Sequence, residues 1–125
     1  MTLGAISLLL NNAGQILWLS YTGKLILYRG AITTEVDYCD SSIFPGLNNR
    51  GQIAYQSDED ALMLYNHDNG VTICLEAVHR GRNDIQINDD GQVLWSDFVG
   101  IAYLATPKNL FGKRIPPILS LLLLD

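Results

Sequence analysis

Positive charge is scarce in this sequence. Lys and Arg number 8 against 13 Asp and Glu in 125 residues, which gives a formal net charge of −5. A phosphate backbone attracts the opposite balance, so we expect no nucleic-acid partner. Charged residues make up only 17% of the chain, below the roughly 25% of an average domain, while hydrophobic residues make up 48%. This composition excludes a wholly disordered chain and suffices for a single domain, residues 1–125, with its own core.

Cysteine and long apolar runs are also lacking. Cys39 and Cys74 are too few for a disulfide scaffold and lack zinc-site spacing, so we expect two small buried hydrophobic residues. The apolar run 115–124 falls far short of the roughly 20 residues of a membrane-spanning helix. The run 5–10 has neither the preceding basic residue nor the following Ala-x-Ala site of a signal peptide. We expect no membrane partner and, by default, a cytoplasmic location, or an exported one if the chain is a fragment.

Helical periodicity is missing from every window, and the chain shows an internal repeat. The pattern apolar-Asn-Asn/Asp-x-Gly-Gln-apolar-x-aromatic occurs at residues 10–18, 47–55 and 87–95. Its glycines are 37 and 40 residues apart. Even spacing of this kind is typical of proteins built from tandem structural units.

Each copy of the pattern predicts a hairpin turn followed by a strand. Asn, Asp and Gly are the residues that such turns favour, because they adopt left-handed backbone conformations readily. After the turn the sequence alternates with period 2: Ile16 and Trp18 share one face, and Leu17 and Leu19 share the other.

Further strands are expected in each copy. Tyr28 and Tyr65 lie 14 residues after the motif glycine, and Tyr103 takes this place in the third copy after a connection two residues shorter. A third apolar segment follows at residues 31–36 and 71–75. Each copy therefore predicts a meander of three or four short strands.

The fold class predicted is all-β, with three tandem meander units of about 40 residues. The units lie at approximately 5–41, 42–81 and 82–125. Residues 119–123 resemble the run that precedes the first motif, so we expect them to begin a fourth copy.

Two architectures suit three such units. In a β-propeller each unit is a blade, and propellers usually have four to eight blades. Three blades alone would leave two exposed edges, which are prone to aggregation. We therefore expect the chain to be a homo-oligomer, with a six-bladed dimer favoured. The alternative is a β-trefoil that closes within one monomeric chain.

One string resembles a known family. Residues 86–95, Gln-Ile-Asn-Asp-Asp-Gly-Gln-Val-Leu-Trp, are similar to the repeats of HAF-type extracellular proteins and related TolB-like propellers. The hairpins at 27–30 and 64–70 stand where that family has a Leu-Tyr hairpin. The resemblance implies propeller-like blades and implies no function. The chain departs from the family in its short length, in its lack of an export signal, and in having Asn12 where the family has an acidic residue.

Equivalent side chains recur in the three units and are the candidate ligand-binding residues. The aromatic positions predict either platforms for a sugar or flat ligand, or packing in the core. The glutamine positions predict either partners for the backbone of the turns or the lining of a central channel. These residues are Trp18, Tyr55, Trp95, Gln15, Gln52 and Gln92.

Other polar residues carry little sign of chemistry. We expect His67 to lie exposed in a hairpin turn and His79 to lie in a loop, and neither is part of a catalytic motif. The acidic cluster 58–60 is expected to be a solvated loop and not a cation site. The basic pairs, Arg80 with Arg82 and Lys113 with Arg114, are expected to balance nearby acids. We expect no catalytic residue, no metal and no cofactor.

The function expected is that of a non-enzymatic β-repeat module for binding or assembly, which completes its fold by self-association. The alternative is a monomeric β-trefoil that binds a carbohydrate or another small ligand. A third reading, a hydrolase-like site of Asp and His on the loops around a propeller channel, stays open, because fold does not decide function.

Overall fold

A computed structural model describes residues 5–40, 42–77, 81–107 and 118–123. The described residues form only β-structure, with no helix, so the all-β prediction is confirmed. The strands are β1 (Ala5–Leu10), β2 (Ile16–Ser20), β3 (Lys24–Arg29), β4 (Ile32–Tyr38), β5 (Gly46–Leu47), β6 (Gln52–Gln56), β7 (Leu62–Asn66), β8 (Val71–Glu76), β9 (Ile85–Ile87), β10 (Val93–Ser96), β11 (Ile101–Thr106) and β12 (Ile118–Leu123).

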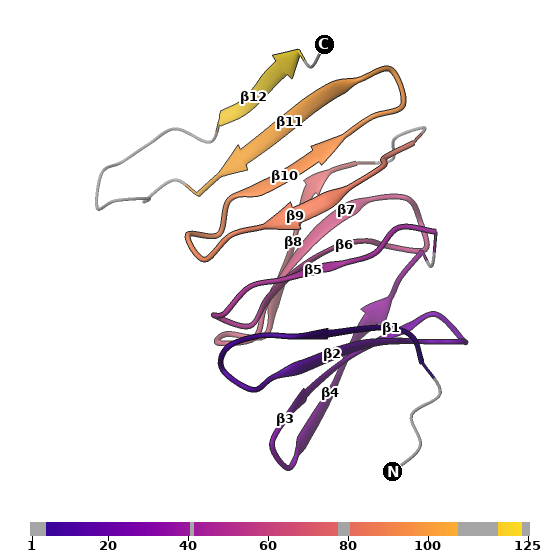
Figure 1. The fold of residues 1–125 in the computed structure, drawn as a ribbon, viewed down its shortest axis with the longest axis vertical. Coiled ribbons are helices and arrows are strands. Elements are labelled where there is room, and N and C mark those ends of the chain that lie inside the picture. Colours follow the sequence, from indigo (N-terminus) through magenta and orange to yellow (C-terminus); the bar gives the residue numbers. More distant parts are fainter. Residues whose placement is uncertain (1–4, 41, 78–80, 108–117, 124–125) are drawn as a thin grey trace.

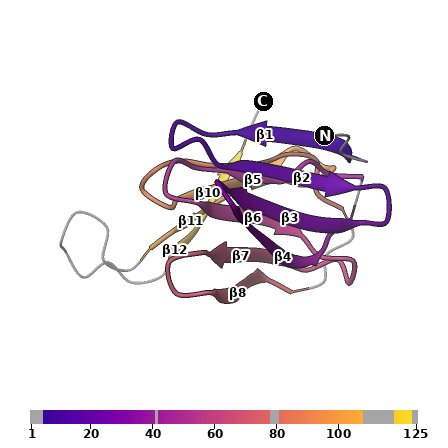
Figure 2. The ribbon, with the colours of Figure 1, turned by 90° about the horizontal axis from the view of Figure 1, so that it is seen from below.

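These strands form three antiparallel sheets of four strands each, and every sheet follows chain order. The first sheet is β1-β2-β3-β4, the second β5-β6-β7-β8 and the third β9-β10-β11-β12. Figure 1 shows the three sheets one above another along the long axis of the molecule. In Figure 2, which looks along the stack, the first sheet lies in front of the second.

The strand register corrects two details of the predicted repeat. Ile16 pairs with Tyr28 and Ile53 with Tyr65, but Val93 pairs with Ala105 and not with Tyr103. The third connection therefore has the same length as the others, and Tyr103 instead pairs with Trp95. Residues 118–123 pair with β11 as the outer strand of the third sheet, so they do not begin a fourth unit.

Each sheet has two different faces, because side chains of a strand alternate and directly paired residues share a face. We call the face that carries Trp18, Tyr55 or Trp95 the leading face of its sheet. The opposite face, which carries Leu17 or Ala54 or Leu94, is the trailing face.

The core consists of trailing faces packed on leading faces. One buried cluster joins the trailing face of the first sheet, with Leu17 and Leu27 at 0–1% exposure, to Ile53 and Tyr55 on the leading face of the second. A second cluster joins Ala54 and Leu62 of the second sheet to Val93 and Trp95 of the third. The stack therefore has one polarity throughout. No sheet of the described residues packs on the leading face of the first sheet or on the trailing face of the third, and we call these two faces uncovered.

Candidate functional site

The repeated turns hold the glutamines that the sequence singled out. In each turn the side-chain amide of the first Asn donates from Nδ2 to the Oε1 of the Gln four residues on, at 2.6, 2.7 and 2.8 Å in chain order. The Oδ1 of the same Asn accepts two backbone N–H groups of its own turn. The glycine between them has φ of +76°, +76° and +80°, a left-handed conformation that favours glycine. The glutamines involved are Gln15, Gln52 and Gln92.

A ladder of hydrogen bonds connects each turn to the next sheet. Asn11 Nδ2 donates to the carbonyl oxygen of Asn48 at 2.9 Å, and Asn48 Nδ2 donates to that of Asn88 at 2.9 Å. The second residue of each turn adds a rung: the Asn12 N–H donates to Asn49 Oδ1, and the Asn49 N–H donates to Asp89 Oδ1. The same contacts thus repeat between the first and second sheets and between the second and third.

The glutamines also lie against the glycine of the next turn. The His67 ring is the group nearest to where a β-carbon on Gly51 would sit, and Gln15 Oε1 follows at 3.0 Å. Gln52 Oε1 is 3.2 Å from that position on Gly91. Around Gly14, in the first turn, no described atom lies within 4 Å of that position. The first turn therefore lacks the cover that the other two receive from the sheet before them.

The three predicted aromatic positions differ in their surroundings. Tyr55 and Trp95 are buried between sheets, at 0% and 1% exposure, and present no face to solvent. Tyr55 donates from its hydroxyl to Asp37 Oδ2 at 2.6 Å, and the Trp95 ring stacks on Tyr103 with centroids 5.7 Å apart. Trp18 is half-buried on the leading face of the first sheet, beside Tyr28. The structure thus does not bring the three rings together.

His67 is not the exposed turn residue that the sequence led us to expect. Its side chain is only 14% exposed and lies against the first sheet. Gln15 Oε1 already accepts a bond from Asn11, so its Nε2 donates to Nε2 of His67 at 3.0 Å. His67 Nδ1 lies 3.4 Å from Asp68 Oδ1 and 3.3 Å from Arg29 Nη1, so this side of the ring faces both a carboxylate and a guanidinium. Burial, and next to it the charge of Arg29, lower the pKa of His67, while Asp68 opposes this.

Stability is therefore expected to depend on pH through His67. Its pKa is below the ordinary 6.5 when folded, so the unfolded chain binds the proton more readily. The free energy of unfolding should be independent of this group above pH 6.5 and should fall as the pH drops through the folded pKa. Urea titrations between pH 5 and 8 measure the effect. His67→Asn should flatten the profile; an unchanged profile in this variant would contradict the assignment.

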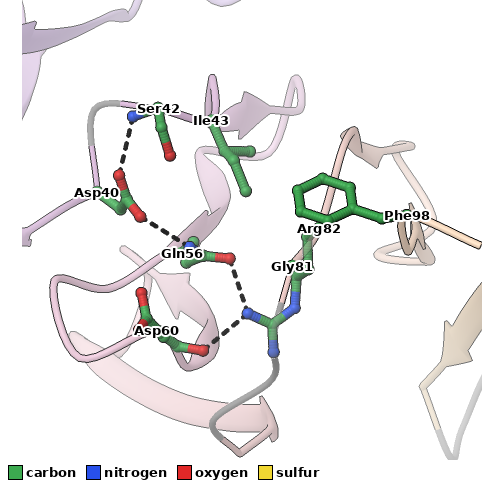
Figure 3. Close-up of a pocket in the computed structure, with 8 residues that line it drawn as sticks. All are labelled: Asp40, Ser42, Ile43, Gln56, Asp60, Gly81, Arg82 and Phe98. Atoms are coloured by element: carbon green, nitrogen blue, oxygen red, sulfur yellow. Dashed lines mark hydrogen bonds between the residues drawn. The ribbon is translucent and has the colours of Figure 1, made fainter.

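A cavity of about 150 Å³ lies where the second sheet meets the segment that leads to the third. Figure 3 shows the guanidinium of Arg82 pointing toward Gln56 and Asp60 below the ring of Phe98. Arg82 is 2% exposed although the sequence places it in a loop with a neighbouring arginine. The sequence led us to expect that it balances a nearby acid, and Arg82 does pair with Glu76, but its burial was not expected from the sequence.

Every N–H of Arg82 has an acceptor. Nε donates to Glu76 Oε1 at 2.9 Å, and Nη2 lies 2.7 Å from the same oxygen, so the two side chains form an ion pair. Nη1 donates to Gln56 Oε1 and to the Asp60 carbonyl, both at 2.8 Å, and Nη2 also donates to the Ala77 carbonyl at 3.1 Å. With five donors filled, the guanidinium has none left for an anionic ligand. Arg82 therefore connects the segment that enters the third sheet to the second sheet.

The acidic and sulfur groups at this joint are also engaged. Asp40 accepts the Ser42 N–H at 2.9 Å and the Gln56 Nε2–H at 2.9 Å, and the Ser42 backbone bond is the main cause that lowers the pKa of Asp40. Burial is the main cause that raises the pKa of the Cys39 thiol to about 12, so it is protonated at neutral pH. These groups hold the joint together and offer no activated nucleophile.

The sequence also singled out the cysteines, the acidic cluster, His79 and the other basic residues. Cys39 is buried as expected, but Cys74 is exposed on the outer strand β8, so the expectation was wrong for one cysteine. Residues 58–60 are exposed. His79, Arg80, Lys113 and Arg114 lie outside the described residues.

The described residues contain no cluster of three or more His, Cys, Asp or Glu side chains arranged to hold a metal ion. Nor do they contain a helix of the length and apolarity that would cross a membrane. Comparisons with protein-family models, with curated proteins and with solved structures find no match.

Proposed function

We propose that this chain is a non-enzymatic β-repeat assembly module, propeller-like in build, that works by stacking further β-sheet surface onto its outer sheets. The observation that carries the proposal is the uncovered leading face of the first sheet. Six apolar residues of this face pair directly across strands β1, β2 and β3: Leu8, Leu10, Ile16, Trp18, Ile26 and Tyr28. Polar residues lie beside them toward β4 and the far end of β2 and β3: Ser20, Lys24, Thr33 and Glu35.

The equivalent positions in the other two sheets support this reading. In the second sheet they include Leu47, Ile53 and Tyr65, which belong to the core against the first sheet. In the first sheet Leu8 and Leu10 are 58% and 74% exposed. An apolar face of this kind is typical of a surface that binds a partner. Sheets in chain order, packed face on face, also support blades over the units of a trefoil.

The proposal predicts self-association of the chain. Light scattering after size-exclusion chromatography, at two concentrations a hundredfold apart, measures the molar mass directly. We expect a mass above the 13.8 kDa of one chain, which falls toward that value on dilution if the association is weak. A single chain at the higher concentration would contradict the proposal and would favour the monomeric ligand-binding alternative.

A further inference from the structure

The turn of the third sheet carries side-chain donors of the kind that, in the first two sheets, bind the turn of the next sheet. Asn11 and Asn48 each use Nδ2 twice, for their own glutamine and for the carbonyl of the next turn. Asn88 Nδ2 reaches its own Gln92 at 2.8 Å, and no second acceptor lies among the described residues. Its next rung would require the carbonyl of a following turn.

The first turn offers that missing acceptor. The Asn48 and Asn88 carbonyls accept a side-chain N–H from the preceding turn, whereas no such donor reaches the Asn11 carbonyl among the described residues. Asn12 Oδ1 stands where Asn49 Oδ1 and Asp89 Oδ1 accept an N–H from the turn before. Gln15 lies beside Gly51, together with the closer His67 ring, and Gln52 lies beside Gly91, together with Pro107. No glutamine of a preceding turn lies beside Gly14 among the described residues, and Gln92 is the glutamine without a next glycine.

The side-chain volumes of the two outer faces are complementary as well. The trailing face of the third sheet carries the small residues Ser96 and Ala102 beside Leu94, and Ala102 is itself only 3% exposed. The equivalent residues of the first sheet are Leu17, Leu19 and Leu25, at 0–1% exposure. Ser96 and Ala102, with Gln86, help to line a shallow cavity of about 170 Å³. Within the chain, Trp95 of the third sheet packs in the same way over Ala54 of the second. Trp18 is the equivalent aromatic residue of the first sheet, and no facing sheet of the described residues offers it a cavity.

From this complementarity we infer that a second copy of this chain continues the stack head to tail, with its first sheet on the third sheet of the first copy. Asn88 then donates to the Asn11 carbonyl of the second copy, Gln92 covers its Gly14, and its Trp18 fills the cavity beside Leu94. The inference rests on the proposed function and names its partner and register. Each copy supplies three sheets and closed propellers have about four to eight, so two copies closing a ring of six is the arrangement that satisfies both ends.

Complementary charges on the two faces test the inference. Trp18→Asp and Leu94→Lys each place a charge in both contacts of a homodimer, and each should raise the dissociation constant about 30-fold or more. In an equimolar mixture one contact is wild type at both positions and the other pairs Asp with Lys, so the mixture should form dimers. Tyr21→Asp, a charge at a 76% exposed turn outside the leading face, is the matched control and should dimerise as the wild type does.

The outcomes separate the inference from the proposed function. A wild-type monomer overturns both. A wild-type dimer that survives both charges, or variants that fail to rescue each other, overturns the head-to-tail contact and leaves self-association intact. A mass above two chains overturns the ring of six.

A covalent test does not depend on the tolerance of the faces to charge. Asn49 Nδ2 donates to Asp89 Oδ2 at 2.9 Å, so a cysteine pair at these positions should form a disulfide within one chain. The pair Asn12→Cys with Asp89→Cys, in a Cys74→Ser background, should instead link two chains under mild oxidation. Failure of this pair to link while the Asn49 and Asp89 control pair closes would contradict the register.

Discussion

Replacing Arg82 with methionine is expected to lower the free energy of unfolding by about 3 to 5 kcal/mol. The substitution leaves the Glu76 carboxylate, 17% exposed in the folded chain, without its ion pair. It also removes the donors that serve Gln56 Oε1 and the carbonyls of Asp60 and Ala77. Chemical denaturation followed by tryptophan fluorescence measures the change.

Two further variants identify the cause. Lys24→Met removes an exposed ion pair with Glu35 at 3.1 Å and should leave stability nearly unchanged, because exposed pairs contribute little. Adding Glu76→Leu to Arg82→Met should restore part of the loss, because no carboxylate is then left without its partner. A loss below about 1 kcal/mol in Arg82→Met would show that the guanidinium is solvated and the joint is open.

Replacing Asn48 with alanine is expected to cost about 3 kcal/mol, more than other substitutions in the turns. The Asn48 side chain makes four hydrogen bonds. Its Nδ2 donates to Gln52 Oε1 and to the Asn88 carbonyl, and its Oδ1 accepts the N–H groups of Arg50 and Gln52. Asn48 is 3% exposed and Gln52 is 8% exposed, so water does not readily replace these bonds. Thermal and urea unfolding of the variant measure the loss.

Arg50→Ala, in the same turn but exposed, is the matched control and should change stability by less than about 0.5 kcal/mol. Amide hydrogen exchange adds a local readout, because loss of Asn48 should deprotect the N–H groups of Arg50 and Gln52 first. Equal stability losses at positions 48 and 50 would mean that the ladder does not hold the second sheet to the third.

The strands and turns were within reach of sequence reasoning because their signals are local. The Asn-Asn/Asp-x-Gly pattern demands a left-handed glycine, and the alternation after it sets the strand. The pairing partner is a longer-range property, and this is why Tyr103 was aligned by residue type when Ala105 holds the equivalent register. The expectation that residues 119–123 begin a fourth copy was wrong for the same reason, because an apolar run does not show which strand it pairs with.

The roles of buried polar residues were harder to foresee. Burial of Arg82 and His67 depends on carbonyls and side chains that come from other units of the repeat. One signal was nonetheless present: Asp60 stands where the other units have Gly23 and Gly100, and it has φ of +65° as they have +85° and +88°. A non-glycine residue at such a position is uncommon, and here its carbonyl is held by Arg82.

The most direct measurement of the central claim is the accessibility of the two tryptophans to acrylamide over a dilution series. Trp95 is buried within the chain at every concentration, whereas Trp18 is half-buried in a single chain. The account predicts that one tryptophan is quenched in dilute solution and that its quenching disappears as the mass doubles. A doubling of mass with Trp18 still quenched would show that the leading face of the first sheet remains uncovered, and would contradict the account.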